Sequence, residues 1–186
     1  MYTRRVLCML LLTWLSTTTV ALAKKASPPP TCMGLPAQVV QFDEQHFDNG
    51  RAEVLVGKPG NNWVIIDALD IYCGTSGEDI VEVVPHAGVA GDSMAVVWGN
   101  AGDDLIFCAA PCEAHGGPGN DILSKEAPVP VIFWASLGND TIMVFAEGQE
   151  VSSYRCGAGT DSVSFDIGVD AAAGDQFIRC EIVDQP

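Results

Sequence analysis

Five aspartates in this chain each follow a glycine-rich turn, and turns of this kind carry the oxygen atoms that hard divalent cations prefer. The phrase is Gly, two residues, Gly, one residue, Asp and then an apolar segment, as in residues 99–106 and 116–123. Glycine adopts positive φ without steric cost, and Ca²⁺ accepts about six to eight oxygens at variable angles. Stacked turns could therefore share calcium ions. The candidate metal ligands are Asp79, Gly102, Asp104, Gly119, Asp121, Gly138, Asp140 and Asp161.

Weaker copies of the phrase extend this repeat along the chain. With these copies included, the second glycine recurs at steps of 11 to 21 residues. A short apolar segment often falls about half-way between two copies. Two short strands and two turns per step describe one coil of a parallel β-solenoid. The weaker copies have Asn62, Ser93 and Gln176 in the aspartate position, after Gly60, Gly91 and Gly174.

The segments that must position these turns are short, apolar and rich in β-branched and aromatic residues. Residues 80–84, 105–107 and 142–145 are examples, and each is bounded by Gly, Asn, Asp or Pro. This pattern is typical of strands joined by tight turns, and no amphipathic helical stretch of useful length interrupts it. We therefore predict an all-β fold, a parallel β-roll or β-solenoid of about seven to eight short coils, over residues 32–186.

The N-terminal residues have the pattern of an export signal. Arg4 and Arg5 precede an apolar run over residues 6–15, and small residues follow up to Ala23. A membrane anchor is the alternative, but the run is too short to span a bilayer comfortably. We predict a signal peptide at 1–23, a disordered proline-rich leader at 24–31, a secreted protein, and no membrane span in the mature chain.

The charge of the chain excludes some partners. Removing residues 1–23 would leave seven basic and 24 acidic residues, a net charge of −17. Such a chain repels nucleic acid and anionic lipid and attracts cations. We therefore predict calcium ions as partners and no nucleic-acid partner, while a protein or glycan partner stays undefined.

Six cysteines remain after the signal segment, and an even number in an exported chain favours disulfides over a metal site. Zinc sites need paired short spacings, and only Cys108 and Cys112 are close. Pro111 favours a bend between these two, which would let their sulfurs meet. The other two bridges would fix the two ends of the solenoid. The predicted pairs are Cys108–Cys112, Cys156–Cys180 and Cys32–Cys73.

Residues 116–123, Gly-Gly-Pro-Gly-Asn-Asp-Ile-Leu, resemble the nonapeptide of the repeats-in-toxin, or haemolysin-type calcium-binding, family nearly residue for residue. Residues 31–40 also look like the start of small secreted bacterial members. The resemblance implies a parallel β-roll with calcium ions between stacked turns, held by the five aspartates. The chain departs from the family because its strong copies lie one coil apart. Only one edge of the roll would therefore hold ions.

We accordingly predict a secreted calcium-binding β-roll protein whose ions are structural. The alternative is a metal-free solenoid, stapled by disulfides, that acts as an extracellular interaction module for a surface, a glycan or a protein. No enzymatic activity is expected. A Gly91-Asp92-Ser93 block and an Asp43-x-x-His46 block resemble those of a lipase/esterase family but occur in the reverse order, and no metalloprotease or phosphate-loop motif is present. Trp63, Trp98 and Trp134 are expected to pack in or beside strands.

Overall fold

A computed structural model describes residues 31–37, 39–40, 45–46, 51–86, 93–166 and 168–182. The predicted signal peptide lies outside the described residues, and so does the predicted leader up to residue 30. The described residues contain no helix long and apolar enough to cross a membrane.

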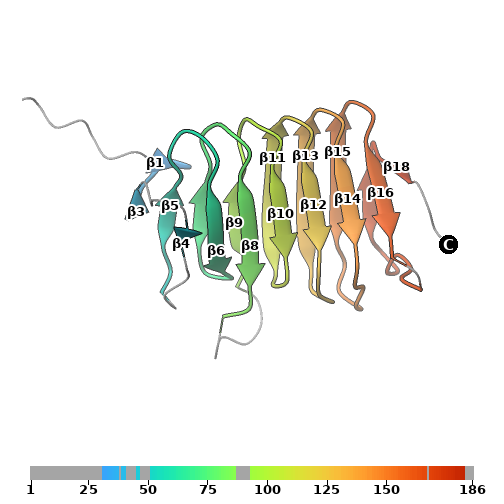
Figure 1. Ribbon diagram of the computed structural model, residues 1–186. Coiled ribbons are helices and arrows are strands. Elements are labelled where there is room, and N and C mark those ends of the chain that lie inside the picture. The colour runs from blue at the N-terminus through green and yellow to red at the C-terminus, as the bar shows by residue number, and fades with distance from the viewer. Residues whose placement is uncertain are drawn as a thin grey trace, which may run out of the picture.

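The described chain forms two parallel sheets of eight strands each, which face one another along the whole molecule (Figure 1). Odd-numbered strands form sheet 1, and even-numbered strands form sheet 2. Sheet 1 contains β3 (Val39–Val40), β5 (Val54–Val56), β7 (Ile71–Cys73), β9 (Ala95–Trp98), β11 (Cys112–Pro118), β13 (Val131–Leu137), β15 (Ser153–Ala158) and β17 (Gln176–Ile178). Sheet 2 contains β4 (Gln45–His46), β6 (Trp63–Asp67), β8 (Ile80–Val84), β10 (Leu105–Cys108), β12 (Ile122–Lys125), β14 (Thr141–Val144), β16 (Ser162–Phe165) and β18 (Glu181–Ile182). A short antiparallel pair, β1 (Thr31–Cys32) and β2 (Leu35–Pro36), precedes them.

Each coil consists of one strand of sheet 1, a glycine turn, one strand of sheet 2 and a second turn. Successive odd strands pair in parallel, as do successive even strands, so the chain winds in one direction without crossing back. Six coils have strands of three or more residues in both sheets, and a shorter pair flanks them at each end. The predicted parallel β-solenoid is confirmed.

Two of the weaker repeat copies were placed wrongly from the sequence. Strand β8 pairs directly with β10, and the Gly77 N–H donates to the Ala101 carbonyl at 2.9 Å, so no coil lies between these two glycine turns. Ser93 therefore lies before β9, at the opposite edge. Gln176 begins β17 in sheet 1, where it is in register with Ser153. In contrast, Asn62 does occupy the aspartate position of its coil, as predicted.

The core is a narrow double layer of apolar side chains between the two sheets. Alternate residues of each strand face inward, so one position per strand repeats along the solenoid. In sheet 2 this inward position follows the aspartate by two residues, as the repeat predicts. Burying each of these side chains contributes about 1.5–3 kcal/mol. The fully or almost fully buried side chains of this column are Val64, Val81, Ile106, Leu123, Ile142 and Val163.

Three disulfides close the structure, with the connectivity that the sequence predicts. The Cys32–Cys73 bridge attaches β1 to β7, and the Cys156–Cys180 bridge attaches β15 to the residue before β18. The Cys108–Cys112 bridge closes the turn between β10 and β11, at the edge opposite the glycine turns. The two long bridges tie down the two ends of the solenoid, where a coil has a neighbour on one side only.

Glycine is required where one turn lies directly on the next. Gly119 has φ of 153°, and a Cβ atom there would lie 1.9 Å from the carbonyl oxygen of Gly102 in the preceding coil. Gly60 has φ of 98°, but a Cβ atom there would meet nothing within 4 Å. The same position of the phrase is therefore constrained by contact in the middle of the solenoid and by φ alone near its N-terminal end.

This difference gives a test of turn stacking. We expect Gly60→Ala to lower the free energy of unfolding by about 1–2 kcal/mol, because it adds only the strain of positive φ. Gly119→Ala should cost more than about 3 kcal/mol, because its Cβ must also push two backbones apart. Denaturant unfolding followed by circular dichroism measures both variants. Equal losses would show that the turns do not stack as described.

Candidate cation site along the glycine edge

One residue per coil, directly after the glycine turn, points into the interior at this edge. Strands of sheet 2 begin at the next residue, so the fold places the side chain at the same height in every coil. All members are buried, with exposed fractions of 5% or less. We call this set the aspartate row, and it comprises Asn62, Asp79, Asp104, Asp121, Asp140 and Asp161. The sequence predicted all five aspartates, and the structure brings them together in one line.

The Oδ1 atom of each aspartate bonds one coil to the preceding one. It accepts the main-chain N–H of the row residue in the preceding coil, at 2.8–3.0 Å throughout. Asp121 Oδ1, for example, accepts the N–H of Asp104 at 2.9 Å. These N–H groups lie at the edge, where the strand ladder has not yet begun. The carboxylates therefore satisfy main-chain donors that would otherwise be buried without a partner.

The Oδ2 atoms of three successive aspartates have no such partner. In the described residues, Oδ2 of Asp104, Asp121 and Asp140 is buried and accepts no hydrogen bond. At the N-terminal end of the row, the Tyr72 hydroxyl donates to Oδ2 of Asp79 at 2.9 Å. A buried acceptor without a partner costs about 1–3 kcal/mol. The three central carboxylates are thus incomplete unless a proton or a cation joins them.

The first glycine of the phrase makes room for these Oδ2 atoms. A Cβ atom at Gly99 would lie 2.2 Å from Oδ2 of Asp104 and 2.7 Å from the carbonyl oxygen of Gly116 in the next coil. A Cβ atom at Gly116 would likewise lie 2.2 Å from Oδ2 of Asp121. A carboxylate oxygen of one coil and a carbonyl oxygen of the next therefore converge on the space beside Gly99. Both are donor types that hard cations accept.

Burial disfavours the ionised form of the three central aspartates of the row. It raises the pKa of Asp104 and of Asp121 to about 7, and that of Asp140 to about 6. Neighbouring carboxylates add to this effect, while the N–H donated to each Oδ1 opposes it. These three carboxyls therefore keep protons to a higher pH than exposed carboxyls do, and a bound cation would offset their charge once they ionise.

A second ladder, which the sequence reasoning missed, runs along the outside of the same turns. The residue before each row member is exposed, and in four coils it accepts the N–H of its counterpart in the following coil, opposite in direction to the inner ladder. The signal was present, because the residue before the row position is Asn or Asp in four copies. The acceptors are Asn61, Asp103, Asn120 and Asn139, at 2.8–3.1 Å.

The donor set at this edge is limited to one inward carboxylate per coil. The described residues contain no group of three or more His, Cys, Asp or Glu side chains that could hold a metal ion. A cation here would therefore be held by carboxylates of adjacent coils together with main-chain carbonyl oxygens of the glycine turns. The residues present fit a hard, oxygen-seeking ion and do not fit a structural zinc site, which is built from Cys and His ligands.

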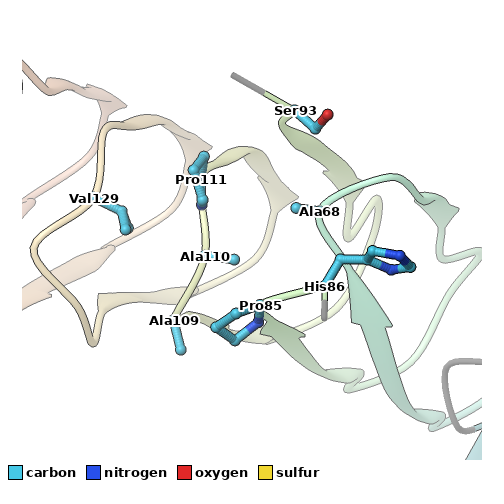
Figure 2. A pocket seen from close by; sticks show the side chains of 8 residues that line it. All are labelled: Ala68, Pro85, His86, Ser93, Ala109, Ala110, Pro111 and Val129. Atoms are coloured by element: carbon cyan, nitrogen blue, oxygen red, sulfur yellow. The ribbon is translucent and has the colours of Figure 1, made fainter. Parts of the chain in front are cut away.

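The opposite edge contains a hollow of about 200 Å³ that includes His86 and Ser93 (Figure 2). His86 Nδ1 contacts Oδ2 of Asp67. The Ser93 side chain and the His86 imidazole lie apart in the figure, and no hydrogen bond joins them in the described residues. Asp43, of the predicted alternative block, lies outside the described residues. This hollow therefore does not assemble a nucleophile with its base.

A buried polar cluster, also missed from the sequence, lies farther along that edge. Lys125 is fully buried, and its Nζ lies 2.5 Å from Oε2 of Glu147 and 3.1 Å from the Ser152 hydroxyl. The Tyr154 hydroxyl donates to Oε1 of Glu147 at 2.8 Å. The cluster satisfies all its members internally, which indicates a structural role. Its partners are 22 to 27 residues from Lys125, so no local pattern could reveal it.

Comparison of this chain with protein-family models, curated proteins and solved structures finds no match. The interpretation of the glycine edge therefore depends on its own geometry and chemistry.

The raised pKa values predict a pH dependence of stability in the presence of a chelator. The folded state keeps protons on Asp104 and Asp121 up to about pH 7, whereas the unfolded chain releases them near pH 4. Stability should therefore fall as pH rises from 5 to 8, by about 1–3 kcal/mol for each of these two groups. Urea unfolding at several pH values measures this loss.

Two asparagine variants separate the inner row from the outer ladder. Asp104→Asn keeps the acceptor for the Asp79 N–H but cannot ionise, so its stability should fall less between pH 5 and pH 8. Asp103→Asn changes the exposed neighbour, which also accepts a main-chain N–H, and should keep most of the pH dependence. Identical profiles for both variants would contradict the assignment of the pH dependence to the buried row.

Proposed function

We propose that this protein is a secreted calcium-binding β-solenoid, in which calcium ions neutralise the aspartate row and hold adjacent coils together. The observation that carries the proposal is the row of buried Oδ2 atoms of Asp104, Asp121 and Asp140, which have no hydrogen-bond partner in the described residues. The role is structural and non-catalytic. The resemblance of residues 116–123 to the calcium-binding nonapeptide is consistent with this proposal.

Calcium suits this edge better than other common cations. The available donors are carboxylate and carbonyl oxygens, which favour hard cations over zinc or copper. Adjacent strands lie about 4.8 Å apart, so two row carboxylates can approach one ion from adjacent coils. Magnesium demands near-ideal octahedral geometry, whereas calcium tolerates the irregular arrangement that main-chain carbonyls of a turn provide.

The strong negative charge of the chain explains why bound calcium would stabilise the folded state. The formal net charge is −15 at pH 7, and the row places ionisable groups one above another in a dry interior. Without a cation, ionisation of the row opposes folding. An ion that binds only the folded chain stabilises it in proportion to the logarithm of its concentration. Folding would then be completed outside the cell, where calcium is available.

The proposal predicts a specific effect of calcium on thermal stability at pH 8. Calcium at about 100 times its dissociation constant should raise the melting temperature by about 5–10 °C, because it contributes about 2.7 kcal/mol. Sodium chloride at the same ionic strength only screens charge and should raise it far less. Differential scanning calorimetry compares the two salts. Equal stabilisation by both would contradict a calcium site.

Substitution of the central row residue locates the effect. Asp121→Asn keeps the acceptor for the Asp104 N–H and removes the charge, so it should lose most of the calcium response while remaining folded. Asp103→Asn is the matched control on the exposed ladder and should keep the response. If both variants respond to calcium as the parent chain does, the ions bind somewhere other than the aspartate row.

A metal-free solenoid that acts as an interaction module is the second candidate. It is favoured by the inner ladder, which already uses every Oδ1 atom of the row and needs only protons on Oδ2 to be complete. In that case the outer face of sheet 2 would contact a protein partner, because it presents Leu105, Phe107 and Ile122 in partly exposed positions. Failure of the calcium response, with the pH dependence retained, would favour this candidate.

A further inference from the structure

A shallow hollow of about 260 Å³ lies on the outer face of sheet 1 near its C-terminal end. It is formed over β13, β15 and β17, at the gold-to-red end of the ribbon in Figure 1. Neither the aspartate row nor the core explains its composition. The lining residues are Trp134, Ser136, Arg155, Gly157, Ile178 and Arg179.

The register of sheet 1 creates this hollow. Trp134, Arg155 and Ile178 are in register and face outward on consecutive strands. Two residues farther on, Ser136 is in register with Gly157. Gly157 has φ of 106°, and a Cβ atom there would lie 2.1 Å from the Ser136 carbonyl oxygen. The close packing of the two backbones therefore excludes a side chain at Gly157 and leaves space beside Arg155.

Stacking holds the Arg155 guanidinium over the sheet. Its Cζ atom lies 3.9 Å from the ring centroid of Trp134. The Trp134 ring stacks in turn on His115, at 5.6 Å between centroids, and His115 stacks on Trp98 at 3.8 Å. A guanidinium held on an aromatic face loses little further rotamer freedom when it binds an anion. The stack therefore pre-orients Arg155.

Neither arginine of the hollow forms an ion pair with a carboxylate of the described residues. The ion pairs between described residues involve His86, His115 and Lys125, and none involves Arg155 or Arg179. The Nε atom of Arg155 is buried without a hydrogen-bond partner. In a chain with 24 acidic and nine basic residues, two arginines in one hollow that have no carboxylate partner among the described residues are not explained by packing alone.

We propose that this hollow binds an oxyanion group, a carboxylate or a sulfate, between the guanidinium groups of Arg155 and Arg179. The Ser136 hydroxyl is available as a further donor, since its hydrogen bond to the Trp134 carbonyl is long, at 3.5 Å. Planar guanidinium groups bind such oxyanions in pairs of parallel hydrogen bonds. The oxyanion can be a free ion or the acidic group of a polysaccharide, and the test distinguishes the two.

Titration with sodium sulfate, followed by amide chemical shifts, tests the proposal at a fixed calcium concentration. We expect saturable shifts at residues 134–136, 155–157 and 178–179, and none of this kind with sodium chloride at equal ionic strength. Arg179→Gln should weaken sulfate binding about tenfold, because it removes a charge-assisted contact. Arg179 is exposed and stacks on no ring among the described residues, so this variant should fold normally.

Arg51→Gln is the matched control, because Arg51 is an exposed arginine outside the hollow. It should leave sulfate binding unchanged. Arg155→Gln should weaken sulfate binding at least as much as Arg179→Gln does. If Arg155→Gln unfolds, the result for Arg179→Gln is decisive. Non-saturable shifts, equal shifts with chloride, or an Arg51→Gln effect as large as that of Arg179→Gln would overturn the proposal.

Dextran sulfate and polygalacturonate, compared with free sulfate and acetate, identify the source of the oxyanion. Tighter binding of a polymer that is lost in Arg179→Gln indicates an acidic polysaccharide. Equal binding per acidic group indicates a free ion. Polymer binding that survives both arginine substitutions, with no site for free sulfate, would exclude the hollow as an oxyanion site. None of these outcomes depends on whether calcium occupies the aspartate row.

Discussion

The structure depends on how main-chain N–H groups at the glycine edge are satisfied between coils. Parallel strands pair along their length, but each coil must also turn. The turn leaves main-chain N–H groups that have no strand carbonyl to bind. The row carboxylates accept one of these donors inside the edge, and the Asn and Asp side chains before them accept another outside it. Because glycine turns pack backbone against backbone, each acceptor lies within reach of a neighbouring coil, the inner one of the preceding coil and the outer one of the following coil. The rest of the core follows from this stacking.

The sequence predicted the repeat-based parts of the fold and not the parts that depend on distant partners. The glycine-aspartate phrase predicted the solenoid, the inward apolar position after each aspartate and the residues of the row, because all of these are local. Cysteine positions also predicted three bridges, since each closes a short turn or an end. The copies after Gly91 and Gly174 were assigned to the wrong edge, because a glycine followed by a polar residue is also an ordinary turn. The Lys125 cluster and the Trp134–Arg155 stack arise only when strands from different coils lie side by side.

The chemistry of this chain is divided between its faces. Inside the glycine edge, carboxylates are dry and have raised pKa values, which suits a cation or a proton. On sheet 1, stacked aromatic rings support an arginine without a carboxylate partner among the described residues. On sheet 2, the outward positions of the central strands are largely apolar. A thin two-sheet solenoid can keep such different surfaces apart. Its outward-facing positions line up along the axis, and the residue type at each of them can change without altering the core.

The two hydrogen-bond ladders have a fixed direction, and this bears on how such a protein can change in length. Each aspartate accepts a main-chain N–H from the preceding coil. An internal coil therefore accepts one such hydrogen bond from the coil before it and donates an identical one to the coil after it. Duplication of one internal coil would therefore insert a unit whose two interfaces already exist in the molecule. Asn62, the first member of the row among the described residues, differs from the aspartates: its amide donates to Asp79 and to two carbonyls of its own turn. Its Oδ1 accepts the Lys58 N–H within that turn. A copy of this coil placed in the interior would therefore not reproduce the bond between coils that a copy of an aspartate-bearing coil would.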